Sequence, residues 1–295
     1  MTIGAPTPYA KVAVMTAALL AQPVAAHAGG GAADAAGPYY ERSFVLAAND
    51  KCRLFTPGLA SALTASAQQA RGAAVRAGVS EGALRETAAR AEARASQTRC
   101  GDPQLGVVRT RVSDAFAGWS RTARMTFPGQ RADWTANRGD FSSPTWRLMQ
   151  ASVTGASPVN FGFAAEGAQG DALKAVVSFV GRPRPYAARI VMRNVERAPR
   201  PWLASAGLPV LPPETSRRAF FAAGSMEAEA TLLPAERSRG QAWVFPVAAA
   251  DALAGLDPRE PFVIEFLFRD DSVARATFEA GDFAAARAFI GMGSL

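Results

Sequence analysis

The chain has 295 residues, of which 49% are hydrophobic and 19% are charged, a composition typical of a folded globular protein with one large or two modest cores. Its formal net charge is +7, and arginine carries almost all of it, because lysine occurs only at positions 11, 51 and 174. The chain contains one histidine, so metal sites built from several histidines are excluded.

The first 28 residues have the pattern of a secretory signal peptide. Lys11 precedes ten uncharged, mostly apolar residues, and the segment ends in the small-x-small sequence Ala26-His27-Ala28. The apolar run is shorter than the ~20 residues that a membrane-spanning helix needs. We therefore expect a periplasmic or secreted protein with no membrane span in the mature chain. Cleavage after Ala28 removes His27 and cleavage after Ala26 leaves it as the amino terminus, so neither product can form a catalytic triad or a Cys-His pair.

Residues 29–38 are mostly small and predict a flexible linker. The following residues, 39–140, predict a helical domain. Thr56 and Pro57 are typical of a helix start, and that helix is expected to end at Gly78. A second helix is expected from Ser80 to just before Cys100. A third is expected from its cap at Asp102 to residue 125, because apolar residues recur there at steps of three and four.

The two cysteines, Cys52 and Cys100, predict one structural disulfide. In an exported chain a single pair of cysteines is expected to be oxidised, and the C-x-x-C spacing of redox-active pairs is absent. The two positions flank the first two of these helices. If those helices form a hairpin, both cysteines lie at the same end of it.

Residues 141–295 predict a mainly antiparallel β domain with a C-terminal helix, which makes the whole chain an α+β protein. Apolar and polar residues alternate here in short segments separated by turn residues. A short helix is expected over residues 248–256 and a final one after Asp282. The expected strands cover residues 145–153, 159–165, 174–180, 187–195, 217–224, 227–233 and 241–246.

The clearest hairpin lies in residues 261–280. Burying its apolar residues on one face requires a three-residue loop, 270–272. That register pairs Phe268 with Ala274, Phe266 with Ala276 and Ile264 with Phe278.

Sequence motifs of catalysis are largely missing. The chain contains no nucleophile elbow, no phosphate-binding loop and no calcium-loop pattern, and we expect neither a metal nor a cofactor. Glu227 and Glu229 are expected on one face of a strand, where two carboxylates can act as acid and base. This pair motivates the alternative function, a carboxylate-dependent hydrolase of envelope polymers. The solvent-facing side of an amphipathic strand explains the same pattern.

Two similar loops, residues 181–186 and 196–202, combine arginine and proline with a terminal aromatic residue. If the loops lie side by side, their arginines and aromatic rings form a basic surface suited to an acidic sugar or a carboxylated peptide. Arginine lying across a neighbouring ring in a proline-stiffened loop is the structural alternative. The candidate ligand-binding residues are Arg182, Arg184, Tyr186, Arg197, Arg200 and Trp202.

The arginine excess has two explanations, the codon bias of a GC-rich genome and an anionic partner. For an exported protein we expect that partner to be an anionic envelope glycan or another envelope protein, and not a nucleic acid. The favoured function is therefore non-catalytic, binding or scaffolding at the cell envelope.

Five segments give the chain a resemblance to a set of exported proteins of GC-rich proteobacteria. The resemblance implies a secreted bacterial envelope protein, and it assigns no activity, cofactor or functional residue. The segments are "DKCRLFTP", "ARGAAVRAG", "DAFAGW", "LDPREPFVIEF" and "GDFAAARAF".

Overall fold

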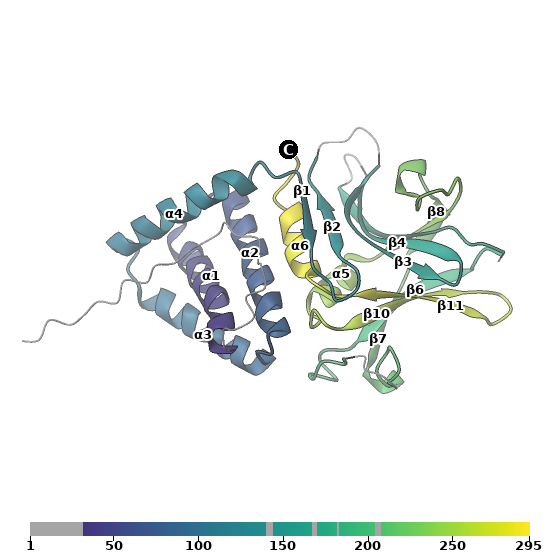
Figure 1. The fold of residues 1–295 in the computed structure, drawn as a ribbon, viewed down its shortest axis with the longest axis horizontal. Coiled ribbons are helices and arrows are strands. Elements are labelled where there is room, and N and C mark those ends of the chain that lie inside the picture. Colours follow the sequence, from purple (N-terminus) through teal and green to yellow (C-terminus); the bar gives the residue numbers. More distant parts are fainter. Residues whose placement is uncertain (1–31, 140–143, 167–169, 182, 204–207) are drawn as a thin grey trace, which may run out of the picture.

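The computed structural model describes residues 32–139, 144–166, 170–181, 183–203 and 208–295. Within them four helices come first, and two antiparallel sheets with two further helices follow (Figure 1). The α+β prediction is confirmed. The predicted signal peptide lies outside the described residues. In the described part of the chain, no helix is long and apolar enough to cross a membrane.

The N-terminal part consists of helices α1 (Ala32–Cys52), α2 (Pro57–Arg76), α3 (Glu81–Gln97) and α4 (Pro103–Trp119). The predicted linker over residues 29–38 is wrong from residue 32 onward, because α1 begins there. The segment is rich in alanine, the strongest helix former. Its side chains also find a packing surface, since Ala35, Ala36 and Tyr39 pack against a buried cluster that includes Val79 and Leu84.

The predicted helix starts are confirmed, although only two of the three use a side-chain cap. Ser80 accepts a hydrogen bond from the backbone N–H of Ala83 at 3.2 Å, at the start of α3. Asp102 accepts one from Gln104 at 2.8 Å, at the start of α4. Thr56 precedes α2 without such a bond, so this start relies on the proline at the first helical position.

Cys52 and Cys100 form the predicted disulfide, with their Cα atoms 5.4 Å apart. The helices that bring them together are α1 and α3, which pack directly against each other, rather than a hairpin of α2 and α3. Lys51, beside Cys52, reinforces the arrangement. Its ammonium group donates to the carbonyl oxygens of Ser96 and Thr98, at the end of α3, at 2.7 Å and 2.8 Å.

The helical part ends earlier than the predicted boundary at residue 140. Helix α4 stops at Trp119, and the chain then forms strands β1 (Arg124–Phe127) and β2 (Trp134–Asn137). Phe127 and Trp134 are fully buried in the core of the β part. Burial of these large side chains explains why the chain leaves the helix here, since a single fully buried aromatic side chain contributes about 1.5–3 kcal/mol.

The first sheet has seven strands in the order β1-β2-β3-β4-β5-β9-β8, and every pairing in it is antiparallel. Apart from β1 and β2, its strands are β3 (Trp146–Thr154), β4 (Ser157–Ala165), β5 (Asp171–Val177), β8 (Gly224–Glu227) and β9 (Gln241–Phe245).

The second sheet has four strands in the order β11-β10-β6-β7, again all antiparallel. Its strands are β6 (Ala187–Arg193), β7 (Arg217–Phe221), β10 (Pro261–Leu267) and β11 (Val273–Glu279). The two predicted helices of the β part are α5 (Val247–Ala254) and α6 (Phe283–Ile290). Helix α6 packs against α2 on one side and against β1 and β2 on the other, so it joins the helical and β parts (Figure 1).

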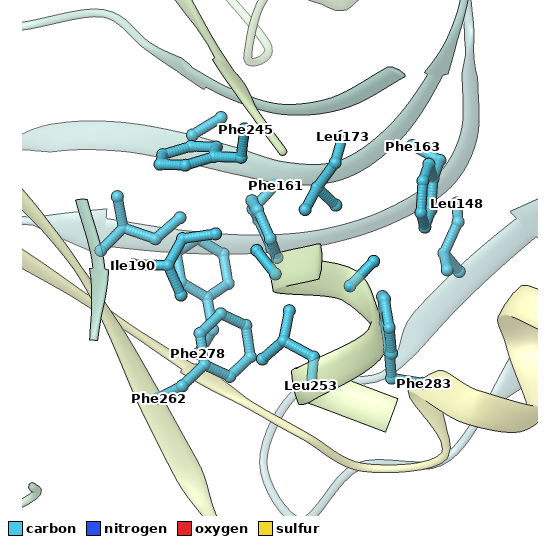
Figure 2. Close-up of a cluster of buried hydrophobic side chains, with 14 of the residues drawn as sticks. Leu148, Phe161, Phe163, Leu173, Ile190, Phe245, Leu253, Phe262, Phe278 and Phe283 are labelled. Carbon is cyan, nitrogen blue, oxygen red and sulfur yellow. The ribbon is translucent and has the colours of Figure 1, made fainter. Parts of the chain in front are cut away.

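One large hydrophobic core lies between the two sheets. Phe161 of β4 is central to it, with its ring 5.4 Å from that of Phe262 and 5.5 Å from that of Phe278 on the second sheet. Leu253 of α5 and Phe283 of α6 belong to the same core (Figure 2). The sheets therefore form a sandwich whose core also takes side chains from both helices of the β part.

The hairpin of β10 and β11 has the predicted buried face and a different register. Phe266 pairs with Ala274 and Ile264 with Ala276, so the pairing is shifted by two residues from the prediction. The reason is a longer loop, in which Phe268 donates its backbone N–H to Ser272 and Asp271 adopts a φ of 60°. A shift of two preserves the faces, because side chains alternate with period two along a strand.

Candidate functional site

The structure separates the two arginine–proline loops. Strand β6 runs from residue 187 to residue 193 and connects the first loop, residues 181–186, to the second, residues 196–202. At about 3.3 Å per residue, a strand of this length holds its two ends about 20 Å apart. The five predicted residues that the structure describes therefore do not form one surface; they are Arg184, Tyr186, Arg197, Arg200 and Trp202.

The first loop contributes Pro183 and Arg184 to the lining of a cleft, and Arg184 is the predicted residue of the two. Arg184 is exposed, and its guanidinium donates a hydrogen bond to the hydroxyl of Ser225 on β8 at 3.1 Å. Tyr186 is 58% exposed, and its backbone N–H bonds to Leu267 at the end of β10. Arg182 lies outside the described residues.

The second loop is anchored rather than free to bind. The backbone N–H of Trp202 donates to the carboxylate of Glu260 at 2.8 Å, and its indole N–H donates to the carbonyl of Pro209 at 3.0 Å. Glu260 also forms a buried pair with Arg193, with two hydrogen bonds of 2.5 Å and 2.6 Å. A buried, bidentate pair of this kind fixes the loop, so Trp202 has a structural role. Arg197 and Arg200 are exposed at this far end of β6.

A cleft of about 500 Å³ lies where β5 and β8 end and β9 begins. Its volume is within the range of small-ligand sites. Val177, Gln241 and Glu227 are paired across these three strands, so they form a row along one end of the sheet. The full lining consists of Val177, Ser178, Phe179, Pro183, Arg184, Glu227, Glu236, Arg237, Ser238, Arg239, Gly240 and Gln241.

The cleft gathers three exposed arginines. Arg184, Arg237 and Arg239 all line it and are exposed. Within the described part of the chain, none of the three forms an ion pair. Three guanidinium groups in one cleft, against the carboxylates of Glu227 and Glu236, favour a ligand that carries negative charge.

The cleft also has an unsatisfied acceptor and an aromatic wall. The side-chain oxygen of Gln241 is buried and has no hydrogen-bond partner among the described residues. A buried polar atom without a partner costs about 1–3 kcal/mol, and a ligand that donates a hydrogen bond to it removes this cost. Phe179 packs edge-on against Phe266 and Phe268 at 5.2 Å and 5.3 Å, which fixes the ring at the cleft. A ligand with both negative charge and hydrogen-bond donors therefore fits best.

The predicted carboxylate pair is not formed. Glu227 ends β8, whereas Glu229 precedes a short 3-10 helix at Ala230–Leu232, so they do not share a strand face. The expected strand over residues 227–233 is interrupted by that 3-10 helix. There the side chain of Leu232 is fully buried in a small cluster on the face of the first sheet that points away from the main core. Glu236 lines the cleft with Glu227 instead, and both are exposed.

The buried carboxylates of the described residues are each paired with arginine, which gives these arginines a structural role. A buried carboxylate requires such a partner, because desolvation of an unpaired charge is costly. The pairs are Arg259–Asp257, Arg193–Glu260, Arg189–Glu265, Arg131–Glu279 and Arg76–Asp282.

No group of three or more potential metal ligands occurs within residues 32–139, 144–166, 170–181, 183–203 and 208–295. The three carboxyl groups with shifted pKa values, Asp171, Glu265 and Asp282, all lie outside the cleft. Burial raises the pKa of Asp282, and the hydrogen bonds and charge of Arg76 only partly offset this. Burial also raises the pKa of Asp171, against the charge of Arg147.

Of the arginines that line the cleft, Arg184 was predicted from the sequence and Arg237 and Arg239 were not. Arg237, Arg239 and Gln241 belong to the segment "ERSRGQ", residues 236–241, between two expected strands. Two arginines beside a glycine in a short connection were the available signal. No protein-family model matches this chain, and no curated protein or solved structure matches it either.

Proposed function

We propose that this chain is an exported, non-catalytic binding protein of the cell envelope and that the arginine-lined cleft is its ligand-binding site. The observation that carries the proposal is that Arg184, Arg237 and Arg239 line one cleft and that none of them is ion-paired within the described residues. Gln241, whose side-chain oxygen has no hydrogen-bond partner among those residues, lines the same cleft. The ligand is anionic and presents hydrogen-bond donors. Acidic glycans and acidic polypeptides both have this chemistry.

Export is supported by two independent features. The sequence of residues 1–28 has the pattern of a signal peptide. The disulfide between Cys52 and Cys100 is of the kind that persists in oxidising compartments such as the periplasm. The intact mass of the protein from an exporting bacterial host, with and without reductant, tests both features. A mass that begins at Gly29 or His27, with no free thiol before reduction, is expected.

The cleft is tested by calorimetric titration with two anionic probes, an oligogalacturonate of ten sugars and a ten-residue peptide of alternating glutamate and threonine. The test variant replaces Arg184, Arg237 and Arg239 with glutamine. We expect at least a tenfold loss of affinity for the probe that binds, because each charge-assisted hydrogen bond is worth about 1.5–3 kcal/mol.

A control variant replaces Arg99, Arg197 and Arg200 with glutamine. These residues are exposed and lie outside the cleft, so the variant loses the same net charge. It is expected to bind like the unmodified protein at 0.15 M salt, where exposed charges beyond about 8 Å are screened. Equal weakening in both variants, or no binding of either probe, would contradict the proposed site.

A hydrolase using Glu227 and Glu236 is the second candidate, because both carboxylates line the cleft. A catalytic acid in such enzymes sits in apolar surroundings, whereas both of these side chains are exposed. We therefore expect mass spectrometry to show each probe intact after prolonged incubation with the protein. Shorter fragments that disappear in the Glu227→Gln variant would establish the hydrolase instead.

A further inference from the structure

Three of the four edge strands of the two sheets are protected against pairing with another chain. Helix α6 packs against β1. Strand β11 contacts β3, where the hydroxyl of Ser152 donates to the carbonyl of Thr277 at 2.6 Å. Strand β7 carries two charged residues, Arg217 and Arg218, and the second lies 4.9 Å from the ring of Phe220. Charged edges and covering elements are the usual means of blocking strand addition.

Strand β8 is the exception. Its sequence, "GSME", contains no lysine, arginine or proline, and Gly224, Met226 and Glu227 are exposed. It is the last strand of the seven-stranded sheet and pairs only with β9 among the described strands. Apart from the single charge of Glu227, none of the devices that protect the other edges is present on it among the described residues.

The register shows which backbone groups of β8 do not bond to β9. Ala228 donates its backbone N–H to the carbonyl of Gly240 at 3.0 Å, so these two residues form a hydrogen-bonded pair. Because hydrogen-bonded and non-hydrogen-bonded pairs alternate along an antiparallel ladder, Met226 and Ala242 form the next hydrogen-bonded pair. The N–H and C=O groups of the intervening residue, Glu227, and of Ser225 therefore point away from β9. They offer a row of donors and acceptors at the open edge of the sheet.

The side chains at this edge face the cleft. Ser225 pairs with Trp243, and Glu227 pairs with the cleft residue Gln241, so these side chains share one face of the sheet. A residue placed opposite Ser225 on an added strand lies on the same face, with Cβ atoms about 4.5–5.5 Å apart. It then lies beside the guanidinium of Arg184, which is 3.1 Å from the Ser225 hydroxyl.

The opposite face of β8 is apolar. Met226 is 49% exposed and lies opposite Ala242, which belongs to a small buried cluster with Leu232. An added strand presents alternate residues to this side, where an aliphatic or β-branched side chain covers Met226. The edge therefore matches a segment that has an acidic residue opposite Ser225 and aliphatic or β-branched residues on the side of Met226.

We propose that the ligand of the cleft is an extended acidic segment of a partner polypeptide, which adds to the free edge of β8 as a further strand and places its acidic side chains beside Arg184 in the cleft. The inference rests on the proposed function and names the class of ligand. The N–H and C=O groups of Ser225 and Glu227, which point away from β9, match the repeat of a polypeptide backbone, which is the basis of recognition by strand addition. An acidic glycan has the charge and lacks that repeat.

The test uses N-methylated forms of the glutamate–threonine peptide. In one form every glutamate is N-methylated, and in the other every threonine is, so the charge and the number of methyl groups are equal. Strand pairing presents only alternate N–H groups to β8. We expect one form to bind at least tenfold more weakly than the unmethylated peptide and the other to bind within a factor of about three. For antiparallel addition the glutamate form is the weak one.

Two variants at one position test the protein side. Glu227→Pro removes an N–H that points away from β9, a change that edge strands tolerate. Glu227→Thr keeps this N–H and removes the negative charge. We expect the affinity of the proline variant for the peptide to fall at least tenfold. The threonine variant is expected to bind the peptide more tightly than the unmodified protein does. If the proline variant does not fold, the methylated peptides still decide the question.

The outcomes separate this inference from the proposed function. Equal binding of the two methylated forms, combined with loss of binding in the variant of Arg184, Arg237 and Arg239, overturns strand addition and leaves an anion-binding cleft. Binding of the oligogalacturonate alone has the same meaning and identifies a glycan site. If neither probe binds, the result contradicts both the anion-binding cleft and strand addition to β8.

Discussion

The guanidinium of Arg76 in α2 donates two hydrogen bonds, of 2.8 Å and 3.0 Å, to the carboxylate of Asp282, the residue that precedes α6. The Asp282 side chain is only 2% exposed. Because α6 also packs against β1 and β2, this pair ties the helical part of the chain to the β sandwich. The position of Asp282 before α6 predicts a side-chain cap, but the structure shows none, because the carboxylate is turned toward Arg76.

Replacing Arg76 with methionine should destabilise the protein by about 3–5 kcal/mol at pH 7, because the change leaves a buried carboxylate without its partner. The free energy of unfolding from urea titrations measures the loss. The double variant Arg76→Met/Asp282→Asn removes the buried charge as well and should recover a large part of it. If the double variant is as unstable as the single one, the buried charge is not the cause.

The cost of Arg76→Met should depend on pH. The pKa of Asp282 is already raised by burial, and removing Arg76 removes a group that lowers it. A carboxyl group with a raised pKa binds a proton more readily in the folded state, so folding gains stability as the pH falls through that pKa. The difference between the unmodified protein and Arg76→Met is therefore expected to shrink between pH 7 and pH 4. A difference that grows over this interval would contradict the assignment.

Gly72 should not tolerate alanine. A Cβ atom at this position of α2 would lie 2.0 Å from a carboxylate oxygen of Asp282, which Arg76 holds in place. We expect Gly72→Ala to lower the melting temperature. The matched control is Gly106→Ala in α4, where a Cβ meets nothing within 4 Å. There the usual helix preference for alanine should stabilise the protein by about 0.5–1 kcal/mol.

Glu265 should contribute stability that is lost in acid. Burial alone would raise its pKa, but hydrogen bonds and charges from Arg275 and Arg189 on the neighbouring strands outweigh burial and lower it. A carboxyl group with a lowered pKa stabilises the fold above its unfolded pKa of about 4.3, and the contribution disappears as the pH falls through the lowered value.

The variant Glu265→Gln measures this contribution. At pH 7 it should be less stable by about 1 kcal/mol, a modest value because the arginine side chains are 36% and 62% exposed and solvent screens them. The loss should be smaller at pH 3 than at pH 7. An equal loss at both values would show that the effect is one of packing.

Removing the disulfide should destabilise the helical part. The bond closes a loop with a sequence separation of 48 residues, which corresponds to about 4 kcal/mol in the chain-entropy treatment. Thermal unfolding of Cys52→Ser/Cys100→Ser should therefore begin at a lower temperature than that of the oxidised protein. Reduced unmodified protein should behave like the double variant. An unchanged melting temperature in both the double variant and the reduced protein would mean that the disulfide does not stabilise the helical part.

Local sequence signals predicted the elements whose stability is mostly local. Ser80 and Asp102 mark helix starts because a side-chain oxygen can satisfy a free backbone N–H within two or three residues. The buried face of the β10–β11 hairpin followed from alternation, whereas its register did not. The register depends on the left-handed turn at Asp271, which the apolar pattern does not specify.

The candidate site was predicted in part. Arg184 was identified because arginine beside proline and an aromatic residue is a recognisable pattern. Its grouping with Arg197 and Arg200 was wrong, because β6 places them at opposite ends of a strand. Arg237 and Arg239 were missed, since they reach the cleft only when β9 pairs with β5 and β8.

The sequence by itself determined the α+β class with its helices before its sheets, the disulfide pair and the absence of any histidine-based chemistry from the body of the chain. Each depends on residue type and short-range spacing alone. The tertiary structure alone decided which charges are neutralised and which converge on the cleft. It also decided that β8 is left as an unprotected edge. These properties depend on pairings between residues far apart in the chain, and the side chains of β-strands meet their partners only after the sheets have formed.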